Sequence, residues 1–158
     1  MLAKWNVGNV ESFRAMFHTC PFNQDISGWN TSSATGQNGM ELMFMCNQSF
    51  NQPINTRYNV IDNYGYYGDV GSTYTAWDVG QVTSLRFVLS HTPFNQPLDK
   101  WNVSNCSTMS YAFLKCSSFN QDISGWNTSG LGSTPNSGAM TQMFHGATVF
   151  NQNLSKWE

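Results

Sequence analysis

Charge and long apolar runs are both scarce in this 158-residue sequence. Only 10% of the residues are charged, and the formal net charge is −2. A chain so close to neutrality has no electrostatic basis for binding nucleic acid or an anionic membrane, so we expect neither partner. No run of about 18 apolar residues occurs, so we expect no helix that spans a bilayer and no direct membrane insertion.

Local motifs for chemistry are also missing. No Cys-x-x-Cys motif accompanies the 4 cysteines, so we expect no metal site. No local Ser-His-Asp or paired-carboxylate arrangement occurs, so we expect no catalytic residues, no cofactor and no enzyme. The first residues, Met1 to Trp5, lack the apolar stretch of a signal peptide. Export is therefore expected to be encoded elsewhere, or the chain is a piece of a longer one.

The dominant feature of the sequence is an internal repeat of 24 or 25 residues. The triplet Phe-Asn-Gln occurs five times, and in four copies a Trp follows seven residues after the Phe. The copy at Phe50 is the exception, because an insertion delays its Trp77. The residues that mark the six units are Trp5, Trp29, Trp77, Trp101, Trp126 and Trp157.

Each unit is predicted to contain one short strand and one short helix. Trp101 and Val103 lie two residues apart and would share one side of a strand, with Asn102 facing away. An apolar set with helical spacing follows the strand in each unit. In the first unit this set is Val10, Phe13, Met16, Phe17 and Cys20.

Such units bury too little apolar surface to fold alone, so stacking them into one core is expected. The predicted fold class is therefore α/β, a leucine-rich-repeat-like solenoid with one short strand and one short helix per unit. The whole chain, 1–158, is expected to be a single domain. Its units are predicted at about 1–21, 22–49, 50–93, 94–118, 119–149 and 150–158, with an insertion at about 53–76.

The repeated units resemble the BspA-like leucine-rich-repeat family of surface proteins. The resemblance rests on units such as FNQPLDKWNVSNCSTM at 94–109 and FNQDISGWN at 22–30, and it covers nearly the whole chain outside the insertions. Thr31 and Thr128 depart from the usual Val. The resemblance implies a secreted or cell-surface protein that adheres to or recognises a partner, and it offers no catalytic residues.

The insertion at about 53–76 is rich in Tyr, Gly and Asn, a mixture that binding loops of antibodies also use. It is predicted either to form a contact surface or merely to cover the core as an extra hairpin. The candidate contact residues are Tyr58, Tyr64, Tyr66 and Tyr67.

A second candidate surface is a row of polar residues on the outward side of the predicted strands. Nothing in the core requires them there, so they could hydrogen-bond a protein or a glycan, or simply be solvated. The row consists of Asn6, Asn30, Asp78, Asn102 and Asn127, with Lys100 beside it. The Asn after each Phe, by contrast, is predicted to bond backbone groups that would otherwise be unpaired.

The cysteines divide into two pairs. Cys20 and Cys46 lie at corresponding positions of adjacent units and could form a disulfide if the units stack closely. Cys106 and Cys116 would lie about 15 Å apart along one helix, too far to bond each other. Cys106 is expected to be a small buried residue.

Two functions follow from these features. The first is a non-catalytic recognition or adhesion module, extracellular or on the cell surface, that binds a protein or a glycan. The second is a structural protein whose copies associate head to tail, because neither end of the repeat shows a polar cap.

Overall fold

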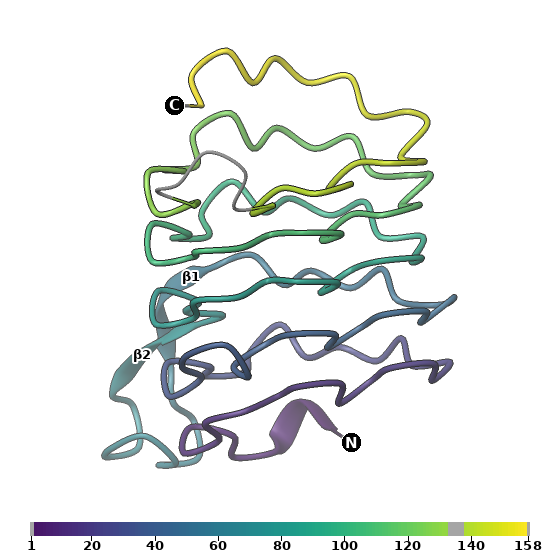
Figure 1. The fold of residues 1–158 in the computed structure, drawn as a ribbon. Helices are drawn as coiled ribbons and strands as arrows, with labels where there is room; N and C mark the ends of the chain where they lie inside the picture. The colour runs from purple at the N-terminus through teal and green to yellow at the C-terminus, as the bar shows by residue number, and fades with distance from the viewer. Residues whose placement is uncertain (1, 133–137, 158) are drawn as a thin grey trace.

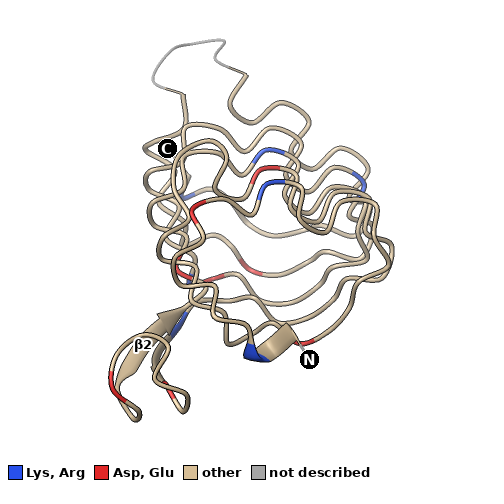
Figure 2. Cartoon of the chain, turned by 90° about the horizontal axis from the view of Figure 1, so that it is seen from below, with Lys and Arg blue, Asp and Glu red and all other residues tan. Residues whose placement is uncertain are grey.

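The computed structural model describes residues 2–132 and 138–157. The chain runs back and forth in a series of passes that lie one above another, from the N-terminal end to the C-terminal end (Figure 1). A two-stranded hairpin projects from the side of this stack near the N-terminal end (Figures 1 and 2). Charged residues are few and occur at scattered points along the chain (Figure 2).

Regular secondary structure is almost absent from the described residues. It comprises the 3₁₀ helix η1 (Leu2–Lys4) and the strands β1 (Arg57–Ile61) and β2 (Thr73–Ala76). The predicted α/β leucine-rich-repeat-like solenoid, with a strand and a helix in every unit, is therefore wrong. No helix within the described residues is long and apolar enough to cross a membrane.

The segments predicted as helices are instead chains of tight turns. In the first, Met16 N–H donates to the carbonyl of Phe13, three residues back, and His18 N–H donates to Ala15. The third residue of the Phe13–Met16 turn, Ala15, has a positive φ of 55°, and so does Thr19, four residues further on. We call these the turn segments: 13–19, 40–46, 85–91, 109–115 and 140–146.

Hydrogen bonds between neighbouring turn segments explain why a helix does not form. Alternate N–H groups, such as those of Phe13, Ala15 and Phe17, donate to carbonyls of the next segment at 2.8–3.0 Å. A positive φ costs a non-glycine residue about 1 kcal/mol or more, and these bonds offset that cost. Apolar residues spaced i, i+3, i+4 lie on one side of a helix, and they also lie on one side of a turn segment. The spacing in the sequence therefore could not distinguish a helix from a series of turns.

The core contains stacked columns of aromatic rings. Phe94 lies 6.2 Å from Phe119 between ring centroids, and Phe119 lies 5.8 Å from Phe150. The expected burial of the repeat tryptophans is confirmed at Trp29, Trp77, Trp101 and Trp126, all of which are less than 5% exposed. The predicted apolar set of the first unit is wrong at Met16, which is 40% exposed, and Met140, which has the same spacing in a later unit, is 49% exposed.

Each buried indole also links neighbouring units through its N–H. Trp101 Nε1 donates to the carbonyl of Ile54 at 2.7 Å, and Trp126 Nε1 donates to Leu98 at 2.9 Å. A buried indole N–H without an acceptor would be costly, so these bonds fix the position of each Trp against the preceding unit.

The Asn of each Phe-Asn-Gln triplet forms a second link, and the prediction that it bonds backbone groups is confirmed. Asn95 Oδ1 accepts the backbone N–H of Asn120 at 3.0 Å, and the Gln121 amide donates to the same oxygen at 3.0 Å. The same backbone bond joins Asn23 to Asn51, Asn51 to Asn95, and Asn120 to Asn151.

All four cysteines are free thiols, so the bridge considered between Cys20 and Cys46 is not formed. Cys106 is buried, as predicted, and so is Cys116. Their Sγ atoms donate to the carbonyls of Val82 and Leu89. Burial raises the pKa of Cys106 to about 12 and that of Cys116 to about 11.

Candidate functional site

The insertion forms an antiparallel hairpin, which we call the tyrosine hairpin (residues 57–76). Strand β1 pairs with β2 in the register Arg57–Ala76, Val60–Tyr74 and Ile61–Thr73. The register shifts between Arg57 and Val60, where Asn59 has a φ of 55°. Asn tolerates this conformation better than most residues, so the irregularity falls at a suitable position.

Asp62 organises the loop that connects the two strands. Its Oδ1 accepts the N–H of Tyr64 at 3.0 Å, and its Oδ2 accepts the N–H of Tyr67 at 2.6 Å. Burial alone would raise the pKa of Asp62, but hydrogen bonds from backbone N–H groups outweigh it and the net shift is downward. The carboxylate is therefore ionised at neutral pH.

Two tyrosines attach the hairpin to the stack. The Tyr67 ring lies against the backbone of Gly8, and the Tyr74 hydroxyl donates to the carbonyl of Gly28 at 2.6 Å. The two rings contact each other, with centroids 4.6 Å apart. Burial raises the pKa of both phenols, so both remain neutral and hydrogen-bonding.

A cleft of about 160 Å³ opens between the tyrosine hairpin and the start of the chain, and we call it the tyrosine cleft. Its exposed aromatic side chains are Trp5, Tyr64 and Tyr66, which are 51%, 52% and 39% exposed. Tyr64 stacks on Tyr66 at 5.3 Å, so the rings hold one another in place. The polar lining includes Asp62 and Asn63.

The structure brings together three of the four tyrosines singled out from the sequence. Tyr64, Tyr66 and Tyr67 line the cleft, whereas Tyr58 lies on β1 outside the lining and is 62% exposed. Sequence reasoning missed Trp5, because it was counted among the core tryptophans of the repeat. It also missed Asp62, although an acidic residue directly before a Tyr- and Gly-rich loop is a usable signal for a turn.

The polar row occupies turns rather than strands. In each member Oδ1 accepts the backbone N–H two residues on, as between Asn102 and Ser104 at 3.2 Å. Asn6, Asn30, Asp78 and Asn127 make the equivalent bond. Lys100 is exposed, and its backbone N–H donates to Asn55. The row thus has a structural role in capping turns, and ligand binding by it stays a prediction.

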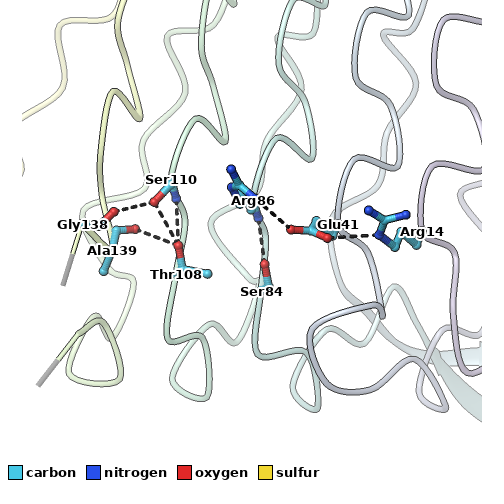
Figure 3. A network of polar contacts seen from close by, with 8 residues as sticks. All are labelled: Arg14, Glu41, Ser84, Arg86, Thr108, Ser110, Gly138 and Ala139. Carbon is cyan, nitrogen blue, oxygen red and sulfur yellow. Dashed lines mark hydrogen bonds and ion pairs between the residues drawn. The ribbon is translucent and has the colours of Figure 1, made fainter.

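A separate polar network runs along the outer side of the turn segments (Figure 3). Arg14 Nε lies 3.1 Å from Glu41, and Arg86 lies 3.8 Å from the same carboxylate. Exposed ion pairs of this kind contribute about 0–1 kcal/mol. In two further passes, Thr108 and Ser110 donate to the carbonyls of Ala139 and Gly138. This network therefore links neighbouring passes of the stack.

Among the residues that the structure describes, no three His, Cys, Asp or Glu side chains are grouped as metal ligands. The protein is a stack of passes that are built from turns, and the tyrosine hairpin is attached to the side of this stack.

The chain belongs to the family described as Mycoplasma protein of unknown function, DUF285, which matches residues 1–64 and 66–158. No curated protein and no solved structure shows a significant match to it.

Proposed function

We propose that this chain is a non-catalytic recognition module, secreted or displayed on a cell surface, that binds a partner through the tyrosine cleft. The observation that carries the proposal is the exposure of Trp5, Tyr64 and Tyr66 around one hollow. Large exposed aromatic groups that gather at one place are typical of interaction sites, because they offer contact area at low entropic cost.

The rigidity of the hairpin supports the same proposal. A site that is fixed before binding loses little conformational freedom when the partner arrives. Here the Tyr74 hydroxyl bond to Gly28 and the packing of Tyr67 on Gly8 hold the hairpin against the stack. The resemblance to BspA-like surface proteins supports placement outside the cell and a role in adhesion.

A panel of purified extracellular-matrix proteins and oligosaccharides, probed with the labelled chain, tests this function. We expect saturable binding that the double variant Tyr64→Ala/Tyr66→Ala abolishes. Tyr58→Ala is the matched control, because Tyr58 is an exposed tyrosine of the same hairpin outside the cleft. Equal binding by the double variant, or binding to no member of the panel, would count against the proposal.

A second proposal, end-to-end association of copies, draws on the outermost turn segments. Among the described residues, no acceptor is found for the N–H groups of Met140, Gln142, Phe144 and Gly146. Likewise, within the described part of the chain, no donor reaches the carbonyls of Ser12, Arg14, Met16 and His18. These N–H groups and carbonyls correspond to the ones that join successive turn segments inside the stack. The N–H groups of the last segment of one copy could therefore donate to the carbonyls of the first segment of another copy.

Sedimentation equilibrium over a range of concentrations tests the association. We expect the average mass to rise with concentration, and we expect Met140→Lys to prevent this by placing a charge at the join. Val70→Lys, at an exposed residue of the hairpin loop, is the control. A mass equal to that of one chain at every concentration would contradict this second proposal.

A further inference from the structure

The chemistry of the tyrosine cleft restricts what it can bind. Its lining combines exposed aromatic rings with one carboxylate, Asp62, and one carboxamide, Asn63. Among the described residues that line it, none is Lys, Arg or His, but the Lys4 ammonium lies beside the cleft, 5.6 Å from the centroid of the Tyr64 ring. The cleft thus meets one negative group, Asp62, and one positive group, Lys4. A ligand that fits must therefore present an apolar face to the rings and hydroxyl or amide groups to the polar side chains, without a net charge.

We propose that the tyrosine cleft binds one pyranose ring of a neutral glycan. The inference rests on the recognition function proposed above and adds the chemical class of its ligand. One face of a pyranose is covered by C–H groups that pack on an aromatic ring, whereas its rim carries hydroxyl groups. A cleft of about 160 Å³ suits a single ring of this size rather than a folded protein segment.

The exposed carboxamide of Asn63 is the polar group suited to the hydroxyl rim, because Asp62 is only 2% exposed. Each of the Asp62 carboxylate oxygens accepts one backbone N–H, from Tyr64 and Tyr67. The backbone N–H groups of Gly65 and Tyr66 also bond to this carboxylate, so its about four acceptor sites are occupied within the loop and none is left for a sugar hydroxyl. These bonds hold the loop that carries Asn63, so that loop loses little freedom when a ligand binds.

Charge argues against acidic sugars and against cationic ligands. The ionised Asp62 repels a carboxylated or sulfated sugar. A quaternary ammonium group would suit aromatic rings, but the Lys4 ammonium already lies 5.6 Å from the centroid of the Tyr64 ring. A second cation at this place would be repelled by Lys4, whereas a neutral sugar would not.

Isothermal titration of the intact chain with single sugars tests the inference. The probes are the methyl glycosides of glucose, galactose, mannose and N-acetylglucosamine, with N-acetylneuraminic acid and choline for comparison. We expect one or more of the neutral glycosides to bind at 1:1 stoichiometry, and neither charged probe to bind. Trp5→Ala and Tyr66→Ala should each weaken binding about three- to tenfold, the value of one aromatic stacking contact.

Tyr58→Ala is again the matched control and should bind like the unaltered chain. Trp5 and Tyr66 are exposed, so both variants should melt at nearly the same temperature as the unaltered chain. Absence of binding by all four neutral glycosides would overturn the inference, and so would binding that neither cleft variant weakens.

The two proposals fail differently. If a panel protein binds the chain, Tyr64→Ala/Tyr66→Ala abolishes that binding, and no glycoside binds or competes, then the glycan inference is wrong and the recognition module stands. If the double variant leaves all panel binding intact, the recognition function at this cleft is wrong as well.

Discussion

The ring of Tyr67 lies directly on the backbone of Gly8. A methyl group added at Gly8 would come within 2.5 Å of Tyr67 Cε1 and 2.7 Å of Cδ1. The backbone of Gly8 is not in the left-handed region, so the close approach of the ring is what requires glycine here. The corresponding positions of other units carry Ser32, Gly80, Ser104 and Ser129, and the nearest neighbours of Gly80 are the side chains of Asp78 and Asn102 rather than a tyrosine ring.

Gly8→Ala is therefore expected to displace Tyr67 and loosen the tyrosine hairpin. We expect a loss of about 1–3 kcal/mol in unfolding free energy, the usual cost of overpacking. Amide hydrogen exchange should become faster across residues 57–76 more than elsewhere. Gly125→Ala is the control, since a methyl group at Gly125 would meet nothing within 4 Å. Equal protection of the hairpin in both variants would disprove the packing role of Gly8.

The asparagine of a Phe-Asn-Gln triplet should stabilise the fold more when it lies inside the stack than when it lies in the last unit. Asn95 Oδ1 accepts two hydrogen bonds from the next unit, so Asn95→Ala should cost about 1–3 kcal/mol in urea unfolding. Asn151→Ala should cost much less, because within the described residues no donor reaches its side-chain oxygen. Similar midpoints for the two variants would show that the links contribute little.

Two tryptophans of the same repeat should differ sharply in their effect on stability. Trp101 is 3% exposed and bonds to Ile54, so Trp101→Ala should cost about 3–5 kcal/mol. Trp5 is 51% exposed, so Trp5→Ala should change the unfolding free energy by less than about 1 kcal/mol. Thermal and urea unfolding measure both values. A large loss in Trp5→Ala would mean that Trp5 belongs to the core.

Thiol labelling should separate the cysteines into two classes. Cys20 is exposed and Cys46 is partly exposed, so both should react with iodoacetamide in the folded chain, Cys20 faster. Cys106 and Cys116 should react only after unfolding, because burial raises their pKa to about 12 and about 11. Mass spectrometry of labelled peptides, with and without urea, measures this. Rapid labelling of Cys106 in the folded chain would contradict the described packing.

Acid should weaken the hairpin through Asp62. Because the folded state lowers the pKa of Asp62, the carboxylate stabilises the fold above the unfolded value, about 3.9. This contribution is lost as the pH falls through the lower folded value. We expect Asp62→Asn to be less stable than the unaltered chain at pH 7 and the gap to narrow below about pH 4. A gap independent of pH would exclude this role.

The sequence predicted which residues of each unit are inside, but not the backbone that places them there. Phe13 and Phe17 are buried as expected, yet they belong to turns. Nothing in the residue types of Ala15, Leu42 or Phe87 indicates a positive φ. Those conformations depend on hydrogen bonds to segments about 24–45 residues further along the chain, which no local pattern contains.

The candidate site was predictable only in part, for a similar reason. The composition of the insertion indicated Tyr64, Tyr66 and Tyr67, because a Tyr- and Gly-rich loop is informative by itself. Trp5 joins them from the other side of the cleft. It carries the same repeat signature as the buried Trp29 and Trp101, so only its position in the outermost pass exposes it.

By itself, the sequence determined the repeat period, the aromatic core and the position of the inserted loop. These follow from residue type and spacing, since apolar rings are buried wherever a repeated chain allows it. The tertiary structure alone decided that the backbone forms turns instead of helices and strands, and that the tyrosine hairpin packs over Gly8 beside Trp5. Both features depend on backbone hydrogen bonds and ring contacts between segments that are distant in the sequence. These interactions stabilise the chain only after the segments have come together.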